Sequence, residues 1–298
     1  MAGEVPEAQQ GALRRMFLRV WQPVADASDR LVMHDGLEIA GSMAFSAILA
    51  LFPFLIFLFA AAAFFDMEGT ARDVAEYMFG TLPPEVAGAL SAPLMEAMRI
   101  RDPDLLTIGA VLALWAASNG VETLRTGLTR AYDAEEERSV IRRRIESIFI
   151  VIFSAALALV IGYLTVVSNL LWPETSSILP QAAVDFANAL FGNAVFHYAI
   201  AFVILFLALL LSHLWLPGGH RSVAQVLPGV LLTSVAWLVL AAGFSAYLSQ
   251  FGSYVTLYGG LGGVAAAMVF FYFTATVILF GAELNRALKS FAAKASKG

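Results

Sequence analysis

Residues 195–216 read VFHYAIAFVILFLALLLSHLWL, a stretch with no Lys, Arg, Asp or Glu. A helix needs about 20 apolar residues to cross the roughly 30 Å hydrocarbon core of a bilayer, and this stretch is long enough. The rest of the chain has the same character, because 59% of its 298 residues are hydrophobic and only 14% are charged. An ordinary soluble domain has about 25% charged residues. The composition therefore predicts one membrane domain and excludes a water-soluble fold.

Five further apolar stretches pass the same length test, so the sequence predicts six transmembrane helices. The predicted spans are residues 39–65, 105–121, 148–172, 195–216, 226–249 and 257–281. The second span is short, and Gly109, Ser118 and Asn119 weaken it further. The predicted fold class is an all-α polytopic membrane protein of the bacterial inner (plasma) membrane.

The positions of Lys and Arg predict which side of the membrane each loop faces. With a cytoplasmic amino terminus, 15 of the 18 Lys and Arg residues fall in inner segments. The other three, Arg72, Arg99 and Arg101, lie in the first outer loop. Because Lys and Arg near the ends of spans are retained in the cytoplasm, both termini are expected to be cytoplasmic.

Two segments outside the spans show helical periodicity. Residues 1–38 place apolar side chains at helical spacing among arginines, which predicts an amphipathic helix lying in the membrane interface. The outer loop 66–104 has two amphipathic stretches separated by a Pro-Pro pair, which predicts a small helical cap. The chain thus divides into 1–38, a six-helix transmembrane domain 39–286 and a cytoplasmic tail 287–298.

Polar residues beside the spans are the first candidates for function, because charged groups inside hydrocarbon are costly. Asn119, Glu122 and Arg125 lie where the second span meets the cytoplasm, and Glu122 and Arg125 are close enough on a helix to pair. This group forms either a helix-end ion pair or part of a polar gate in the substrate path. Glu283 and Asn285 close the last span and form either a cap of the bundle, which we favour, or part of the gate.

An arginine cluster, Arg138, Arg142, Arg143 and Arg144, precedes the third span at the depth of lipid phosphates. Guanidinium groups bind phosphate oxygens through pairs of hydrogen bonds, so the cluster is a candidate contact for an anionic headgroup. Retention of the loop in the cytoplasm is the simpler interpretation. The acidic residues at 135–137 partly cancel the positive field.

Proline and glycine mark two spans as irregular. Pro53 interrupts the first span and predicts a kink, since an interior proline removes a backbone hydrogen bond. The sixth span opens with several glycines, among them Gly259 and Gly263 beside Tyr258. Small residues four apart favour close packing of helices, and the alternative is a broken helix that lines a substrate path.

Metal, cofactor and catalytic motifs are missing from the sequence. The absence of Cys excludes disulfides, thiolate metal sites and cysteine nucleophiles. His34 and His220 each stand alone, and His197 and His213 lie at opposite ends of one span, too far apart to share a metal. We therefore predict no catalytic residue, no metal and no cofactor.

Four blocks of sequence resemble one known family. They are HDGLEIAGSMAFSAILALFPFL at 34–55, LWAASNGVETLRTGLTRAYD at 114–133, RRRIES at 142–147, and FGSYVTLYGGLGGV with LFGAELNR within 251–286. Together they resemble the YihY/BrkB family of bacterial inner membrane proteins over nearly the whole chain. The resemblance implies a six-helix membrane protein whose members were formerly misnamed ribonuclease BN and for which lipid translocation has been proposed.

Two functions are compatible with these residues. A transporter or translocator of a lipidic or amphiphilic substrate fits the kinked span, the glycine-rich sixth span and the scarcity of charges inside the spans. A non-transporting envelope scaffold would use the acidic outer loop 66–104 to bind envelope proteins. RNA cleavage would need clustered carboxylates and a basic surface, so we expect no ribonuclease activity and no nucleic-acid partner. Membrane lipids are the expected partners, and a homo-oligomer is left open.

Overall fold

The structure, a computed structural model, describes residues 21–64, 103–157, 180–182, 184–185, 194–257 and 260–295. Over these ranges the long elements are all α-helices, so the predicted all-α class is confirmed. They are a helix at 21–33, α2 at Gly36–Phe64, α5 at Pro103–Ala131, a helix at 140–157, α8 at Ala194–Trp215, α9 at Val223–Leu257 and α10 at Gly260–Ala295.

The helices extend beyond the predicted spans at one end. α5 continues ten residues past the predicted boundary at 121, and α10 continues past 281 to Ala295. The span boundaries mark where apolar residues stop, whereas the helices go on through polar residues that other helices cover. By length and composition, two described helices, Val223–Tyr247 and Val264–Ala293, can cross a membrane.

Large apolar side chains cover the outer faces of the helices. Trp115 on α5 is 56% exposed, Leu211 on α8 is 58% exposed, and Val239 on α9 is 68% exposed. Soluble monomers rarely expose apolar surface this continuously, because its contact with water is unfavourable. The described surface is therefore one that a lipid environment would stabilise.

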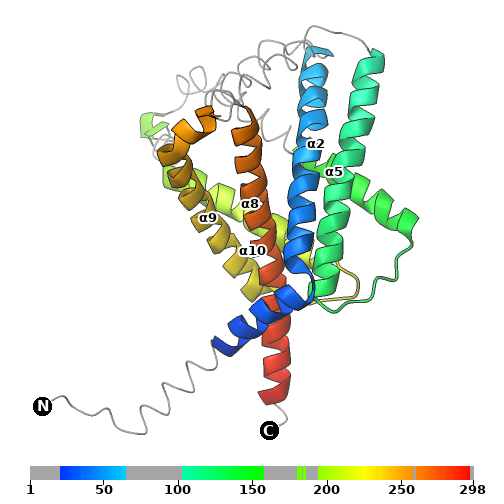
Figure 1. Cartoon of the computed structure of the whole chain (residues 1–298), viewed down its shortest axis with the longest axis vertical. Helices are drawn as coiled ribbons and strands as arrows, with labels where there is room; N and C mark the ends of the chain where they lie inside the picture. The colour runs from blue at the N-terminus through cyan, green and yellow to red at the C-terminus, as the bar shows by residue number, and fades with distance from the viewer. Residues whose placement is uncertain are drawn as a thin grey trace, which may run out of the picture.

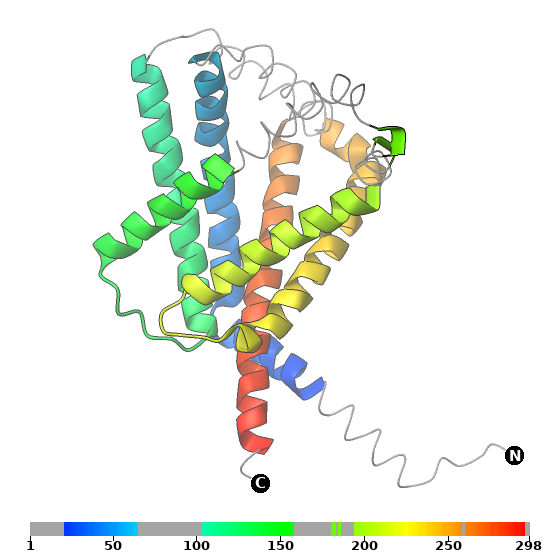
Figure 2. The same ribbon diagram turned by 180° about the vertical axis from the view of Figure 1, so that it is seen from behind.

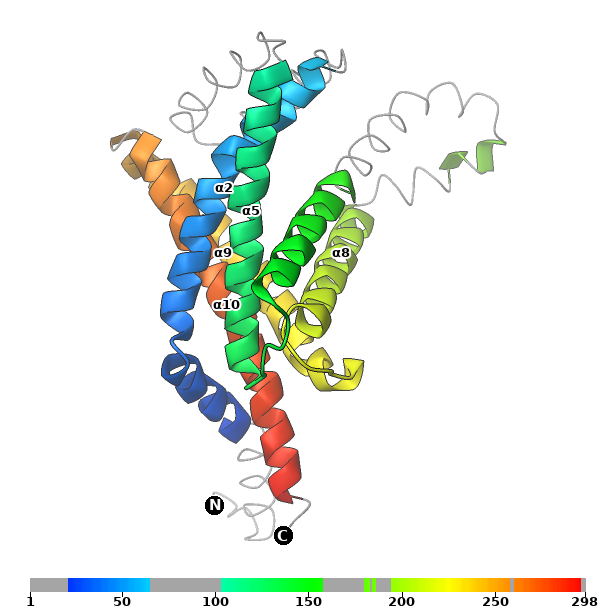
Figure 3. The same cartoon turned by 90° about the vertical axis from the view of Figure 1, so that its right-hand side faces the viewer.

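The helices form two packed groups that meet at α10. α2 and α5 lie antiparallel along most of their length, and α10 packs against both α2 and α9 (Figure 1). α8 contacts α9, and α8 and the 140–157 helix are both inclined to the α2–α5 pair (Figures 2 and 3). The 21–33 helix crosses α10 near its C-terminal part (Figure 1).

One end of the bundle holds the densest packing between helices. Its apolar core is made by Leu31, Ile39, Ala40, Leu128, Ala131, Tyr132, Leu216, Val226, Ala275, Leu279 and Ala282. α9 and α10 approach so closely there that a methyl group added at Gly229 or Gly281 would collide with the facing helix. Small residues at a crossing allow this close approach of two backbones.

The 21–33 helix packs its small apolar side chains on α10. Ala27 is fully buried against Leu284 and Ala287, and Val24 packs beside them. The described part of the predicted interfacial helix thus turns these residues toward protein, and the sequence pattern could not distinguish a protein surface from a membrane surface. Trp21 and Met33 are exposed on the same helix.

Two aspartates in left-handed conformation end helices at the packed end. Asp35, with φ of 55°, separates the 21–33 helix from α2, and Asp133, with φ of 48°, follows α5. The amides of Asp133 and Ala134 donate to the carbonyls of Arg130 and Thr129 at 2.9 and 3.0 Å, the pattern of a Schellman cap. Asp and Asn adopt this conformation more readily than other non-glycine residues. Both caps point a carboxylate back at the bundle end.

Several sequence predictions concern residues outside the described ranges. These are residues 1–20, the outer cap within 65–102, the part of the third predicted span at 158–172, Tyr258 and Gly259, and the end of the tail at 296–298. The backbone is helical at Pro53 within α2 and at Gly263 within α10. The kink and the broken helix stay predictions.

Candidate functional site: a buried polar layer and its cavity

A layer of buried polar side chains lies at the packed end of the bundle. It contains Ser118, Arg125, Ser147, His213, Thr233, Ser234, Glu283 and Asn285, none more than 3% exposed. Charged groups are rarely buried unless they are paired, because removal from water is costly. The pairing within this layer, which we call the polar layer, determines what its members can do.

Glu283 joins α10 to the 21–33 helix. The Arg30 Nε donates to Glu283 Oε2 at 2.9 Å, and the His34 Nδ1 lies 2.6 Å from Glu283 Oε1. The Glu283 side chain is only 1% exposed, so both of its oxygens are satisfied by groups from the amino-terminal helix and turn. His34 is therefore a partner of Glu283, and the sequence interpretation of His34 as isolated is wrong. The spacing of 249 residues hides this contact from sequence patterns.

Asp133 extends this contact to the end of α5. Its Oδ2 accepts from Arg30 Nη2 at 2.9 Å and from Arg286 Nε at 2.9 Å. Partial burial opposes the charge of Asp133, but the two arginines outweigh it and hold the pKa of Asp133 below its ordinary value. Asp133 thus fastens α5, α10 and the 21–33 helix together. We call Arg30, His34, Asp133, Glu283 and Arg286 the ionic junction.

Arg125 forms the second centre of the polar layer. Its Nε lies 3.2 Å from Glu122 Oε1, which confirms the predicted pairing on one helix face. Its Nη1 contacts Glu146 Oε2 at 3.1 Å and the Leu216 carbonyl at 3.2 Å. Glu122 in turn accepts from Ser147 Oγ at 2.6 Å. Arg125 therefore ties α5 to the 140–157 helix and to the end of α8.

Arg138 uses its whole guanidinium group internally. Its Nε and Nη2 donate to the two carboxylate oxygens of Glu136 at 2.7 and 2.8 Å. Its Nη1 reaches Glu146 and the Trp215 carbonyl, and its Nη2 also reaches the Leu216 carbonyl at 2.6 Å. All five N–H donors of the side chain are thereby matched. Arg138 acts as a clamp between the loop after α5 and the end of α8.

The other arginines of the sequence cluster separate into different environments. Arg144 donates to Asn119 Oδ1 at 2.7 Å and lies over the Trp115 ring at 5.9 Å. Arg143 approaches Glu122 at 3.8 Å. Arg142 is 70% exposed and contacts only Glu146 among the described residues. Of the four predicted headgroup arginines, Arg142 has the most exposed side chain.

Asn285 connects α10 to α9 and to the end of α5. Its Oδ1 accepts from the Gly229 amide at 2.6 Å, and its Nδ2 donates to the Val226 carbonyl and to the Tyr132 hydroxyl, each at 2.9 Å. Burial raises the pKa of Tyr132 to about 12, so the hydroxyl stays neutral. Asn285 thus joins α10 to the first two turns of α9 and to the end of α5, and the sequence alternatives of a bundle cap and a gate both stay predictions.

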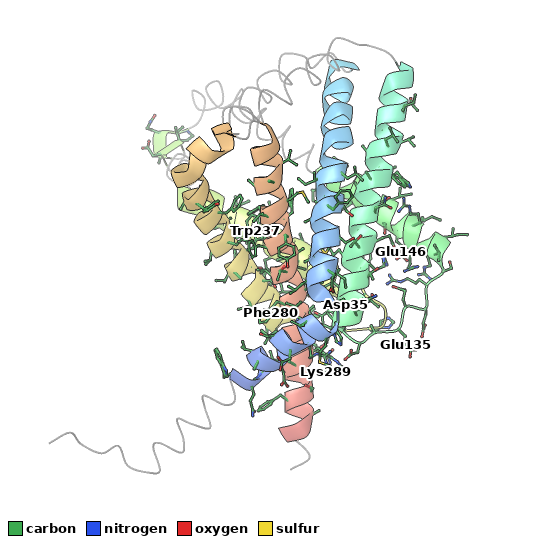
Figure 4. All side chains as sticks on the ribbon, in the orientation of Figure 1. Asp35, Glu135, Glu146, Trp237, Phe280 and Lys289 are labelled. Carbon is green, nitrogen blue, oxygen red and sulfur yellow. The ribbon has the colours of Figure 1, made fainter. Side chains whose placement is uncertain are left out.

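A cavity of about 790 Å³ opens beside Arg125 and Arg138, between the 140–157 helix and the α8–α9 turn. Its polar lining includes Arg125, Glu136, Arg138, Arg142, Glu146 and Arg221. Its apolar lining consists of Ile145, Phe149, Ile150, Leu214, Trp215 and Val223, together with Pro217. Figure 4 shows Glu146 on the 140–157 helix and Glu135 on the loop before it. We call this space the α8–α9 cavity.

A shallower polar groove lies between α2 and α5. Its volume is about 590 Å³, and it is lined by Asp35, Glu38, Ile39, Ser42, Glu122, Thr123, Thr126 and Arg130. Asp35 and Arg130 form an exposed ion pair at 3.0 Å across its mouth. Glu122 lines this groove, and its ion-pair partner Arg125 lines the α8–α9 cavity.

Sequence reasoning found some members of the polar layer and missed others. The structure brings Asn119, Glu122 and Arg125 together with the arginine cluster, and brings Glu283 and Asn285 together with α5 and α9. Patterns could not predict the partners Arg30 and Asp133, because the residues that they contact lie far away in the sequence. Within the described ranges no group of three or more His, Asp or Glu residues could hold a metal ion.

Comparison with known proteins places the chain in a family. The model of the family described as virulence factor BrkB matches residues 27–298. The protein YfkH of Bacillus subtilis, whose name calls it ribonuclease-like, is 30% identical over 87% of this chain and 92% of its own length.

Other relatives are named as membrane proteins. A UPF0761 membrane protein of Pseudoalteromonas atlantica is 25% identical over 94% of this chain and 92% of its own length. A UPF0761 membrane protein of Rhodospirillum centenum is 24% identical, and the match spans 98% of this chain but 60% of that relative. No solved structure matches the chain. The resemblance found in the sequence is thereby confirmed, and the chain is a membrane protein that belongs to the BrkB family.

Proposed function

We propose that the chain is a translocator of a lipidic or amphiphilic substrate in the bacterial inner membrane. The observation that carries this proposal is the mixed lining of the α8–α9 cavity. Arginine and glutamate side chains line one part of it, and Ile145, Phe149, Trp215 and Val223 line another. A charged headgroup and an acyl chain need these two surfaces side by side.

The exposure of the apolar lining supports an opening of the cavity toward lipid. Ile145 is 62% exposed and Trp215 is 67% exposed, and both lie on the rim of the cavity. An acyl chain entering from the bilayer would cover these side chains at little cost, because it exchanges one apolar contact for another. A small polar solute would gain nothing from them.

The membrane arrangement belongs to the same proposal. Six spans with both termini in the cytoplasm would place the polar layer, the arginines and the α8–α9 cavity at the cytoplasmic face. The positive-inside distribution of Lys and Arg supports this orientation. The cavity would then open at the level of the inner leaflet.

The proposal assigns no catalytic chemistry and no cofactor to the chain. The buried carboxylate of Glu283 and the partly buried carboxylate of Glu122 are engaged by Arg30 and Arg125 and serve as ion-pair partners at the polar layer. The alternative of an envelope scaffold depends on the outer loop 66–104, most of which lies outside the described residues. Membrane lipids are the proposed partners, without nucleic acid.

Reconstituted vesicles test the proposal directly. The purified protein is inserted into liposomes that contain lipids labelled on the acyl chain, with ethanolamine, glycerol or choline headgroups in separate preparations. A membrane-impermeant reductant bleaches the outer leaflet, and translocation exposes the inner label with time. We expect faster loss of the protected label than in protein-free vesicles for at least one headgroup, and protein-free rates for all three would contradict the proposal.

A matched pair of isoleucine variants localises the path. Ile145 lines the cavity, whereas Ile152 lies two turns further along the same helix, is 52% exposed and does not line it. We expect Ile145→Asn to slow translocation and Ile152→Asn to leave the rate close to that of the wild type. Equal effects of the two substitutions would exclude the α8–α9 cavity as the path.

A further inference from the structure

We propose that the α8–α9 cavity binds the phosphate group of an anionic phospholipid through Arg221 and Arg142. Arg221 lies in the turn before α9, and Arg142 lies opposite on the 140–157 helix. This inference rests on the proposed translocation insofar as it names the class of substrate. The binding step itself depends only on the lining of the cavity.

Arg221 carries a half-buried charge without a counter-ion among the described residues. Its Nη1 and Nη2 donate to the Pro217 and Gly218 carbonyls at 3.4 and 2.7 Å, and its guanidinium lies 4.3 Å from the centre of the Tyr132 ring. No described carboxylate forms an ion pair with it. Burial, together with repulsion from Arg286, lowers the pKa of Arg221 from its usual value. A phosphate oxygen would supply the missing negative charge.

The acidic residues of the cavity do not compete for Arg221. Glu146 is shared by Arg125, Arg138 and Arg142, and Glu136 is held by Arg138 in a two-point ion pair. Hydrogen bonds to Arg138 hold the pKa of Glu136 below its ordinary value. These two carboxylates are therefore already neutralised. Glu137 also lines the cavity, so the lining holds four arginines against three glutamates, and its formal charge is positive.

Arg142 provides the second contact. Only its Nε is engaged, at 3.1 Å from Glu146 Oε1, so its terminal nitrogens remain available on an exposed side chain. Arginine suits this role because its planar fork can bind two phosphate oxygens at once. Arg138, with five matched donors, positions the carboxylates and has none to offer a ligand.

Apolar side chains line the cavity next to the two arginines, where the acyl chain of a bound phospholipid would lie. Phe149 and Ile150 follow Arg142 along the 140–157 helix, and Val223 follows Arg221 at the start of α9. A free phosphate ion would contact the arginines alone, whereas a phospholipid would also cover this surface. The cavity lining therefore favours an anionic amphiphile over a free anion.

Binding measurements on the whole protein test the assignment. The purified chain in a nonionic detergent is titrated with short-chain phosphatidylglycerol, with phosphatidylcholine and with inorganic phosphate, and bound lipid is counted by native mass spectrometry. We expect phosphatidylglycerol to bind more tightly than either control probe. Replacing Arg221 by Gln should weaken phosphatidylglycerol binding about tenfold or more, the factor expected for a lost charge-assisted contact.

Two further variants keep the result interpretable. Arg142→Gln changes an exposed side chain, so folding should be retained while binding weakens. Arg130→Gln removes the same charge from the exposed pair with Asp35 outside the cavity and should leave binding unchanged. Equal affinity for the glycerol and choline lipids, or an equal loss in Arg130→Gln and Arg221→Gln, would overturn the assignment. Binding of inorganic phosphate as tight as that of phosphatidylglycerol would also overturn it.

The vesicle assay separates this assignment from the proposed function. Selective binding that depends on Arg221, with no translocation of any labelled lipid, would overturn the proposed translocation and leave the binding site. Translocation at the same rate for glycerol and choline headgroups, unaffected by Arg221→Gln, would overturn the present assignment and leave the translocation.

Discussion

Replacing Asn285 by Ala should show what the polar layer contributes to stability. The Asn285 side chain is 3% exposed and makes three hydrogen bonds, to the Gly229 amide, the Val226 carbonyl and the Tyr132 hydroxyl. Alanine removes all three at once. The substitution therefore tests the contact between α10, α9 and the end of α5.

The expected magnitude follows from these contacts. Hydrogen bonds between helices of membrane proteins average about 0.6 kcal/mol and reach about 1.7 kcal/mol. Three bonds thus give roughly 2–3 kcal/mol. We expect Asn285→Ala to lower the free energy of unfolding by about 3 kcal/mol.

Reversible unfolding in mixed micelles, followed by tryptophan fluorescence, measures this loss. Tyr132→Phe is the matched control, because it removes only the bond to Asn285 and should cost about 1 kcal/mol. The double variant should lose less unfolding free energy than the sum of the two single losses, since both substitutions remove the same bond. A cost for Asn285→Ala no greater than for Tyr132→Phe, or full additivity, would refute the reasoning.

Three further predictions concern packing and charge at the same end of the bundle. Gly281→Ala should lower the midpoint of thermal unfolding, since its methyl group would meet α9, whereas Gly243→Ala, with no neighbour within 4 Å, should leave it unchanged or raise it. Arg138→Gln should cost about 2–3 kcal/mol of unfolding free energy, because the substitution leaves partly buried acceptors unpaired. Arg142→Gln should cost less than about 1 kcal/mol. Equal costs would contradict the role of Arg138 in joining the loop after α5 to the end of α8. Because the pKa of Asp133 is lowered in the folded state, Asp133 should stabilise the protein fully above its unfolded pKa near 4 and lose that contribution as the pH falls. Asp133→Asn should therefore flatten the acid side of the profile of thermal stability against pH. An unchanged profile would count against the ionic junction.

The helices were predictable from sequence because each is a long apolar run. Composition and hydropathy alone located the helices at 36–64 and 194–215 to within a few residues, whereas α9 continues eight residues past the predicted end at 249 and the 140–157 helix begins eight residues before the predicted start at 148. Apolar runs alone do not locate the polar extensions of α5 and α10 at 122–131 and 282–295. These extensions are helical because their polar groups find partners on neighbouring helices.

The candidate site was predictable only where partners are close in sequence. The pair of Glu122 and Arg125 follows from helical spacing, whereas the bonds of Asn285 to Gly229 and Val226 do not follow from its place at the end of a span. The contact of His34 with Glu283 depends on how the 21–33 helix crosses α10, which no local pattern encodes. Arg221 could have been suspected as the one basic residue between the fourth and fifth predicted spans.

The account depends most on the polar layer facing the cytoplasm, and the sidedness of two single cysteines tests this directly. The natural chain has no cysteine, so Glu135→Cys and Glu85→Cys each introduce a single thiol. In intact spheroplasts a membrane-impermeant maleimide should label the cysteine at 85 and should reach the one at 135 only after permeabilisation. Labelling of both positions from the same side would contradict the orientation, and with it the placing of the α8–α9 cavity in the inner leaflet.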